Sequence, residues 1–385
     1  MKVLSISTDR KLFEDGSTVL SRSLEYAKKM DELHIVVFTT SQKSKAESKK
    51  VGSNLFLYPT NSISKLFYIF DAIKIGSQII GNWKLKIGNL SDAVLSTQDP
   101  FETGFVGTRL KKRFGLPLQI QIHTDFFSSH FKNSILNLAR IFLSKIVIAK
   151  ADGIRVVADF LKESLVKHFP KTKNIIEILP VFVDIEKISN TLPKRGLNQE
   201  FPKFKFIILM ASRLAKEKRI DIALKAFKNV LIKFPHSGLV IAGSGEQKRA
   251  LENMVIKLRL ENNVVFVGWQ KDLVPLYKSA DLFLVTSEYE GYGMTLMEAG
   301  ASGCPIVTTS VGIAKTGLFI NGQNSLVCRI CDTGCISAGI LDIISDNSKR
   351  ELFKHKMQDS IKSIAISKEK YAEKYVSLLK KLLND

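Results

Sequence analysis

Short apolar runs and segments of helical periodicity alternate along most of the chain. The first run covers residues 3–7, a helical pattern begins near Ser17, and a second run follows at 35–38. Further runs of this kind occupy residues 93–96, 118–122, 152–157, 175–179, 206–210, 239–242, 264–267, 282–285 and 306–308. Continuous apolar runs separated by amphipathic helices are typical of parallel strands that are covered on both faces. The pattern therefore predicts an α/β fold built from βαβ units.

The length of the chain indicates more than one core. Its 385 residues suit two domains of roughly 150 to 200 residues each. The segment 185–204 is rich in Asn, Pro and charged residues, which is typical of a linker. We therefore expect an N-terminal Rossmann-like domain over 1–184 and a C-terminal one over 205–365. A last helical pattern, at 368–383, has an apolar face that must pack against another element.

Two glutamates flank a glycine-punctuated turn that follows one of the apolar runs. Glu290 precedes this turn, whereas Glu298 lies about one helical turn inside the helix predicted next. Ligands of open α/β sheets bind at the carboxyl ends of strands, where a helix N-terminus presents N–H groups to a phosphate. Gly291 and Gly293 allow a ligand to approach the main chain closely. The alternative is a capping box, because Thr295 and Glu298 fit the S/T-x-x-E pattern.

The stretch around these glutamates resembles a known family. Glu290-Gly-Tyr-Gly-Met followed by Glu298-Ala-Gly-Ala-Ser-Gly-Cys-Pro305 is similar to the E-x7-E signature of retaining glycosyltransferases with the GT-B fold, family 4 in the sequence classification. A second stretch, ASRLAKEKRIDIALKAF from Ala211, resembles the family's G-R-L-x-x-x-K-x-x-x-x-L-x-x-A segment, with Ser212 in place of the glycine. The resemblance is strong in the second half of the chain and loose in the first.

The resemblance implies the GT-B architecture, in which two Rossmann-like domains have parallel sheets facing each other across a cleft. It implies that residues 366–385 cross back onto the first domain. It also implies retaining transfer of a sugar from a nucleoside diphosphate sugar to a saccharide or lipid-linked acceptor, in the synthesis of cell-envelope glycolipids or polysaccharides. Because no D-x-D triplet is evident, we expect neither a metal ion nor a cofactor.

The resemblance also assigns roles to individual residues. Glu298 is expected to hold the ribose hydroxyls and Glu290 the hydroxyls of the donor sugar, while Arg213 and Lys218 bind the diphosphate. His123 matches the family's site histidine, which contacts the donor sugar near the reacting carbon. Without the resemblance, the two cations would be surface residues and His123 a satisfied loop residue. The remaining expected donor-binding positions are Gly16, Gly243, Gly268, Gly291, Gly293, Met294 and Thr295.

Two glycine motifs depart from the family pattern. Relatives commonly carry a Gly-Gly pair where this chain has Asp15-Gly16-Ser17, and a capping role of Ser17 explains the segment equally well. A second Gly-Gly pair followed by a glutamate is replaced by Gly312 and, three residues later, Lys315. These departures support one alternative function, a non-catalytic nucleotide-sugar-binding or membrane-associated scaffold. A second alternative is a GT-B-type nucleotide-sugar epimerase, which would share the base and phosphate contacts but work without an acceptor.

The charge of the chain indicates an anionic partner. The net charge is +20 and the pI is about 9.6, yet no zinc-finger, RNA-binding or helix-turn-helix pattern supports nucleic acid. Residues 61–86 set aromatic and aliphatic side chains among lysines, which is typical of a helix at an anionic membrane surface. The alternatives are a core-packed helix whose lysines reach solvent and, for the charge as a whole, a merely soluble surface.

The compartment is predicted from what the sequence lacks. No apolar run approaches the roughly 18 residues of a spanning helix, and the charged start is unlike a secretory signal. We therefore expect a cytoplasmic protein, either soluble or peripheral on the inner face of the cytoplasmic membrane. Cys328, Cys331 and Cys335 lie close in sequence, but no fourth zinc ligand is evident. Free intracellular thiols are therefore expected.

Overall fold

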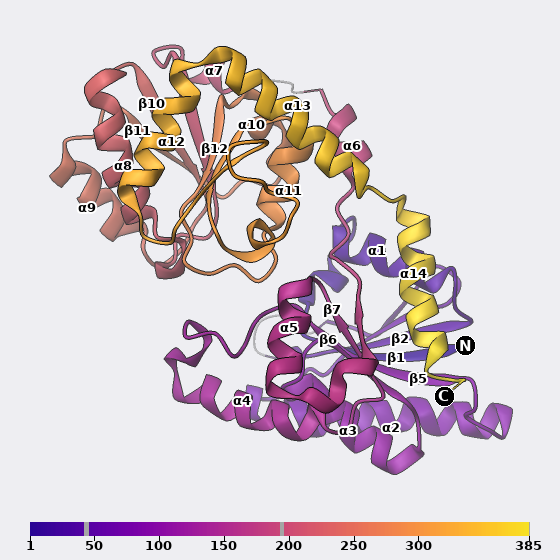
Figure 1. Cartoon of the computed structure of the whole chain (residues 1–385). Coiled ribbons are helices and arrows are strands. Elements are labelled where there is room, and N and C mark those ends of the chain that lie inside the picture. Colours follow the sequence, from indigo (N-terminus) through magenta and orange to yellow (C-terminus); the bar gives the residue numbers. More distant parts are fainter. Residues whose placement is uncertain (42–45, 193–195, 385) are drawn as a thin grey trace. The chain divides into compact units, whose positions relative to one another are not determined.

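The computed structural model describes residues 1–41, 46–192 and 196–384. The chain divides into two compact units, one formed by Met1–Phe182 with Ile366–Asp385 and the other by Val183–Ala365 (Figure 1). Each unit contains its own sheet with helices on both faces, which confirms the predicted α/β class. Within the described residues, no helix is both long enough and apolar enough to cross a bilayer.

The sheet of the first unit has eight strands in the order β3-β4-β2-β1-β5-β6-β7-β8. The strands are β1 (Lys2–Ser7), β2 (Glu32–Val37), β3 (Lys49–Val51), β4 (Leu55–Pro59), β5 (Ala93–Thr97), β6 (Leu118–Ile122), β7 (Gly153–Val156) and β8 (Ile176–Ile178). All neighbouring pairs are parallel except β3 with β4. The apolar runs of the sequence become central strands because both faces of a parallel sheet are covered.

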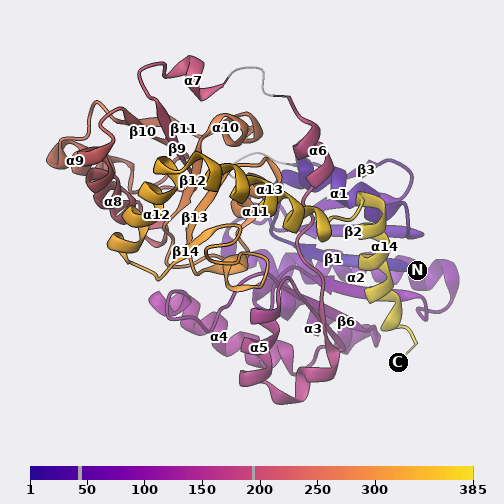
Figure 2. The ribbon, with the colours of Figure 1, turned by 45° about the horizontal axis from the view of Figure 1, so that its top comes forward.

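Helices cover both faces of this sheet. They are α1 (Thr18–Ala27), α2 (Tyr68–Ile87), α3 (Glu102–Phe114), α4 (Ile135–Ile148), α5 (Asp159–His168) and α14 (Lys368–Lys381), with 3-10 turns at Arg10–Phe13, Lys65–Phe67, Phe131–Asn133 and Pro170–Ile175. In both views α14 lies beside α1, on the face opposite α2 and α3 (Figure 1, Figure 2). The buried Tyr371, Tyr375 and Leu379 of α14 join the hydrophobic core there. The last twenty residues thus complete the first unit.

The second unit has a six-stranded parallel sheet in the order β11-β10-β9-β12-β13-β14. The strands are β9 (Phe206–Ala211), β10 (Ser237–Ala242), β11 (Val264–Gly268), β12 (Leu282–Val285), β13 (Ile306–Thr309) and β14 (Leu326–Cys328). The helices are α6 (Ile185–Asn190), α7 (Leu197–Glu200), α8 (Ile220–Lys233), α9 (Lys248–Leu258), α10 (Val274–Ser279), α11 (Met294–Ala301), α12 (Thr333–Ser345) and α13 (Asn347–Ser363), with 3-10 turns at Lys216–Lys218 and Gly312–Lys315. The main core lies between the sheet and α8, α9 and α12.

The segment 185–204, which the sequence predicts to be a linker, contains α6 and α7. In the structure α6 contacts α11 and α7 contacts α10, so both helices belong to the second unit. Residues 193–195 of this segment lie outside the described residues. The passage between the units instead falls at Phe182 and Val183, two residues before the predicted boundary, and again at Ala365 and Ile366.

Candidate functional site

The candidate donor site lies where the strand order of the second sheet reverses. From β9 the chain proceeds outward to β10 and β11, and then returns to place β12 on the other side of β9. The carboxyl ends of two such strands form the usual ligand crevice of an open α/β sheet. The loop after β9 carries Arg213 and Lys218, and the loop after β12 carries Glu290. The fold therefore gathers these predicted residues at one edge of the sheet.

Glu290 and Lys218 form an ion pair at this edge. The Nζ atom of Lys218 lies 2.7 Å from Glu290 Oε1, and the same oxygen accepts a 2.7 Å hydrogen bond from Ser287 Oγ. The Thr286 hydroxyl donates to the carbonyl of Lys218 at 3.0 Å, which ties the two loops together. The carboxylate is therefore held in place from both strands. Ser287 and Thr286 belong to no family motif, so the sequence did not predict their role.

Glu298 lies in α11 and contacts a buried tyrosine. The Tyr277 hydroxyl donates to Glu298 Oε2 at 3.3 Å. Burial raises the pKa of the Glu298 carboxyl, and the bond from Tyr277 partly opposes this shift. Helix α11 begins after Gly293 without any side-chain cap bond. The capping-box alternative for Thr295 and Glu298 is therefore wrong, and Glu298 is not used to start the helix.

The N-terminus of α11 follows a left-handed glycine. Gly293 has φ +101°, and Met294 and Thr295 are the first residues of the helix. Gly312 supports this turn from behind. It has φ +52°, and an added Cβ would lie 2.5 Å from the Tyr292 carbonyl oxygen and 2.8 Å from Glu290 Cβ. Gly312 is therefore needed for the close packing that positions Glu290. From the sequence, Gly312 was noted only because it stands where relatives have a Gly-Gly pair.

Arg213 is placed differently from Lys218. Its side chain is 76% exposed, and Nη2 contacts Glu217 Oε1 at 3.0 Å. No contact joins it to Glu290 within the described part of the chain. The guanidinium is therefore at the surface, although its partner Glu217 is only 13% exposed. Its predicted role in binding the diphosphate stays a prediction.

Two further glycines hold the neighbouring loops together. Gly243 has φ +143°, and a Cβ at this position would lie 1.8 Å from the Ser212 carbonyl oxygen, so no other residue fits. The Gly243 N–H donates to the carbonyl of Gly268 at 2.7 Å. The loops after β9, β10 and β11 are thus packed backbone to backbone. Gly291 lies in the loop between Glu290 and Gly293.

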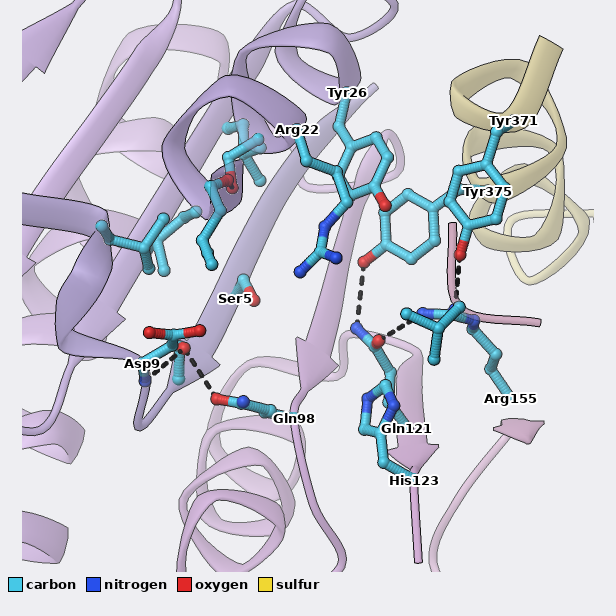
Figure 3. Close-up of a pocket in the computed structure, with 17 residues that line it drawn as sticks. Ser5, Asp9, Arg22, Tyr26, Gln98, Gln121, His123, Arg155, Tyr371 and Tyr375 are labelled. Carbon is cyan, nitrogen blue, oxygen red and sulfur yellow. Dashed lines mark hydrogen bonds between the residues drawn. The ribbon is translucent and has the colours of Figure 1, made fainter. Parts of the chain in front are cut away.

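A polar pocket lies at the corresponding reversal of the first sheet, between β1 and β5. Its volume is about 230 Å³, and it is lined by residues of β1, α1, β6, β7 and α14 (Figure 3). His123, just beyond β6, lines this pocket. Burial, with smaller contributions from Arg155 and Arg22, lowers the pKa of His123 to about 3. The imidazole is therefore neutral at physiological pH and can act as a hydrogen-bond partner but not as a cation.

Hydrogen bonds organise the walls of this pocket. The Ser7 hydroxyl donates to Gln98 Oε1 at 2.7 Å, and Gln121 Nε2 donates to the Tyr375 hydroxyl at 3.1 Å. Arg155, which is 4% exposed, donates from Nη1 to Gln121 Oε1 at 2.7 Å. Gln98 directly follows β5. Arg155 and the tyrosines were missed because they come from segments far apart in the chain.

Gly16 does not line this pocket. It has φ +74° with nothing near its missing Cβ, and it precedes Ser17, the N-cap of α1. The Ser17 hydroxyl accepts a 3.2 Å bond from the Leu20 N–H. The capping interpretation therefore accounts for the local conformation. A contact between Gly16 and a donor stays a prediction.

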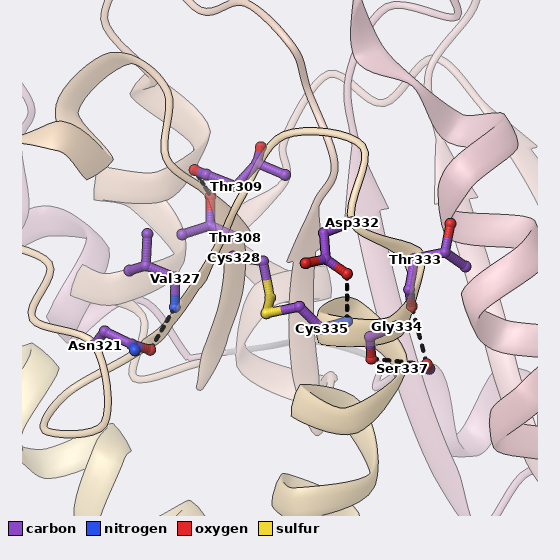
Figure 4. The surroundings of a disulfide bond; sticks show 10 residues. All are labelled: Thr308, Thr309, Asn321, Val327, Cys328, Asp332, Thr333, Gly334, Cys335 and Ser337. Atoms are coloured by element: carbon purple, nitrogen blue, oxygen red, sulfur yellow. Dashed lines mark hydrogen bonds between the residues drawn. A yellow bond between two sulfur atoms is a disulfide. The ribbon is translucent and has the colours of Figure 1, made fainter.

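The expectation of free thiols is wrong for two cysteines. Cys328 and Cys335 form a disulfide that joins the end of β14 to the first turn of α12 (Figure 4). Asp332 caps that helix by accepting a 2.8 Å bond from the Cys335 N–H, which brings the second sulfur towards the strand. Cys331 is exposed, and Arg219 Nη1 donates to its sulfur at 2.7 Å. Sequence spacing alone could not distinguish this pairing from a metal site.

Part of the chain is similar to known proteins. Residues 197–359 match the family described as Glycosyl transferases group 1. An uncharacterized glycosyltransferase of Methanocaldococcus jannaschii is 28% identical over 59% of this chain and 56% of its own length. The poly(glycerol-phosphate) alpha-glucosyltransferase of Bacillus subtilis is 31% identical over 43% of this chain and 24% of its own length. The chain thus spans about a quarter to somewhat over half of these relatives.

A solved structure shares the fold over nearly the whole chain. The Anabaena protein Alr3699/HepE, determined in complex with UDP, superposes with a TM-score of 0.76 over 99% of this chain and 100% of its own, at 16% identity. The family match covers the segment that contains Arg213, Lys218, Glu290 and Glu298. The chain therefore has the GT-B fold, and residues 197–359 are similar to the family described as Glycosyl transferases group 1.

Proposed function

We propose that this protein is a retaining glycosyltransferase that moves a sugar from a nucleoside diphosphate sugar to an acceptor hydroxyl. The observation that carries the proposal is the Glu290–Lys218 pair, held by Ser287 at the reversal of the second sheet. The pair lies inside the segment that matches the glycosyltransferase family. The Bacillus relative is named for transfer to poly(glycerol-phosphate), which supports an acceptor of the cell envelope.

Transfer requires the diphosphate leaving group to take up negative charge. Lys218, Arg213 and the N–H groups at the start of α11 would stabilise this charge more in the transition state than in the ground state. Glu290 would bind hydroxyls of the donor sugar, and Glu298 those of the ribose. Because these protein groups supply positive charge, we propose that no divalent ion is essential. Activity that survives EDTA, with Mg²⁺ re-addition as control, would support this part of the proposal.

The first test is donor binding by the whole chain. Calorimetry against UDP-, GDP- and ADP-sugars identifies the base, and UDP comes first because the Anabaena protein with the same fold was solved with UDP. We expect binding to be lost in Arg213→Ala and kept in Arg249→Ala, which changes a cation of α9 outside the site. Product NMR then checks the anomeric configuration. Inversion at the anomeric carbon would disprove the retaining mechanism.

Turnover separates the alternatives. An epimerase would convert the donor sugar without any acceptor, whereas a scaffold would bind the donor and never turn it over. Group transfer instead predicts that release of the nucleoside diphosphate depends on an added acceptor. Mass spectrometry of the products distinguishes all three, because only the transferase yields an acceptor heavier by one sugar.

We also propose that the first unit binds an anionic membrane surface. Helix α4 exposes an apolar face in which Ile135 is 88% exposed and Phe142 is 67% exposed. Leu138 and Ile146 belong to the same face, at helical spacing. The exposed lysines at positions 132, 145 and 150 flank it. An apolar face bordered by cations is complementary to anionic lipid headgroups above an acyl layer.

The segment 61–86, for which the sequence predicted this role, contributes only at its start. Leu66 and Phe70 are 83% and 71% exposed, whereas Ile80 and Trp83 are buried in the core of the unit. Most of α2 therefore follows the core-packed alternative. We therefore propose that α4, rather than α2, makes the main contact with lipid. The sequence of α4 is apolar almost throughout, so it did not indicate that one face of the helix is exposed.

A further inference from the structure

Among the described residues, the buried arginine of the first-unit pocket has no anionic partner. Arg155 donates to Gln121 Oε1 at 2.7 Å, to the carbonyl oxygens of Leu179 at 3.0 Å and Pro180 at 3.2 Å, and to the Tyr371 hydroxyl at 2.6 Å. All of these acceptors are neutral. Its guanidinium also lies 5.6 Å from the centroid of the Tyr375 ring. A buried charge is costly unless an opposite charge pairs with it. The hydrogen bonds satisfy the donors and leave the charge uncompensated.

A second arginine points into the same space. Arg22 extends from α1 into the pocket (Figure 3), and within the described residues no ion pair involves it. Of the described residues that line the pocket, Asp9 alone carries a carboxylate, and its Oδ1 accepts a bond from the Lys11 N–H at 3.1 Å. His123 is neutral because burial and the two arginines lower its pKa to about 3. The lining therefore carries an excess of positive charge.

Neutral donors complete the lining. Gln98 uses its Oε1 atom to accept from the Ser7 hydroxyl at 2.7 Å and from the Thr8 N–H at 2.7 Å. This leaves its amide nitrogen to donate elsewhere. Ser5 also lines the pocket, between Asp9 and Arg22 in Figure 3. Arginines with amide and hydroxyl donors around a small cavity suit a phosphate or carboxylate, because its oxygen atoms accept several bonds at once.

We propose that this pocket binds an anionic group, of the phosphate or carboxylate class, that is carried by the acceptor. The proposal rests on the glycosyltransferase function for the identity of the ligand, but the charge of the pocket is independent of it. The cavity of about 230 Å³ accommodates a small charged group rather than a long saccharide. The acceptor is thus recognised by its charge in addition to its hydroxyl.

The test compares charged and uncharged probes on the full chain. Calorimetry at fixed ionic strength uses inorganic phosphate, glycerol 3-phosphate and glycerol. We expect both phosphates to bind and glycerol not to bind. Arg22→Gln should weaken phosphate binding at least tenfold, because it removes one of the two arginines. Arg109→Gln, which changes an exposed arginine of α3, should leave phosphate binding unchanged. Arg22 is the residue to replace because Arg155 also binds the backbone carbonyls of Leu179 and Pro180, so that its loss could disturb the fold.

Titration with UDP-sugars keeps the two proposals apart. Donor binding retained in Arg22→Gln, together with loss of phosphate binding, would support an acceptor pocket that is distinct from the donor site. Donor binding without any phosphate binding, or equal phosphate affinity in Arg22→Gln and the parent, would overturn the anionic pocket and leave the transferase function standing. Phosphate binding without binding or turnover of any donor would overturn the acceptor assignment. Competition of UDP with phosphate at this pocket would assign the anion to the donor instead.

Discussion

The ammonium group of Lys218 lies 2.7 Å from a carboxylate oxygen of Glu290, and their side chains are only 11% and 15% exposed. The two residues are 72 positions apart in the sequence and follow different strands, so the fold and not local spacing pairs them. A largely buried ion pair of this kind is held by its surroundings. It leaves the second carboxylate oxygen of Glu290 available for a ligand hydroxyl.

Replacing this carboxylate should affect the sugar more than the nucleotide. We expect Glu290→Gln to weaken binding of the intact donor about tenfold, equivalent to about 1.4 kcal/mol, while affinity for the bare nucleoside diphosphate changes less. Calorimetry with both ligands measures the difference. Glu252→Gln, on the exposed face of α9, is the control. Equal donor affinity of Glu290→Gln and the parent would remove Glu290 from the site.

Gly312 should tolerate no side chain. Gly312→Ala forces a Cβ to within 2.5 Å of the Tyr292 carbonyl oxygen at φ +52°, and we expect a loss of about 2–3 kcal/mol in unfolding free energy from strain and overpacking. Donor affinity should fall with it, because the displaced loop carries Glu290. Denaturant unfolding checks the first effect. Gly317→Ala has open space around its Cβ, and an equal loss there would contradict the argument.

The buried His123 should make the stability of the protein decrease at acidic pH. Its pKa is about 3 in the folded chain and about 6.5 when unfolded, so between these values the unfolded state binds the extra proton. The contribution of His123 to stability is therefore greatest above pH 6.5 and falls by up to about 1.4 kcal/mol per pH unit below it. In His123→Gln this slope should decrease. Asp99, whose pKa is raised to about 6 by burial, acts in the opposite direction, so the comparison of variant and parent is essential.

The disulfide should stabilise the second unit. Closing a loop of this size restricts the unfolded chain and stabilises the folded state by about 2–3 kcal/mol. Loss of the disulfide in Cys335→Ser should therefore lower Tm by roughly 5–10 °C. Dithiothreitol should lower the Tm of the parent similarly and leave that of the variant unchanged. Cys331→Ser, at the exposed free thiol, serves as control. A parent protein insensitive to dithiothreitol would show that the bond does not form in solution.

The apolar face of α4 should govern vesicle binding. We expect the parent to bind phosphatidylglycerol-rich vesicles at low salt and to be released by high salt, since cations contribute to the attraction. The double variant Ile135→Ser, Phe142→Ser should bind at least tenfold more weakly, because two exposed apolar side chains can no longer insert. Co-sedimentation measures both effects. Ile232→Ser with Ile256→Ser, on exposed positions of the second unit, is the matched control. Absence of binding at low salt would dismiss the membrane contact.

The strands could be predicted from the sequence because both faces of a parallel sheet are buried. The run 282–285 became β12 residue for residue, and 206–210 became β9 with one residue added. Local chemistry also revealed the cap at Ser17. These features depend on neighbours within a few positions along the chain, which is the range in which a sequence pattern carries information.

The polar pocket could not be predicted in this way. Arg22, Arg155 and Tyr371 come from three segments, and only tertiary packing brings their side chains to one cavity. The sequence likewise gave no means to distinguish the exposed apolar face of α4 from a buried one. Exposure depends on which elements cover a helix, and that is a property of the whole unit.

During synthesis, the first unit can complete its core only after the second unit has been made. Its core requires Tyr371, Tyr375 and Leu379 of α14, which are synthesised only after residues 183–365 have emerged. Because domains fold as units while the chain is synthesised, the second unit can complete its core first. The first unit, although made earlier, then still lacks α14, which covers its α1 face. The opening half of the chain is therefore the half exposed longest to proteases and chaperones during synthesis.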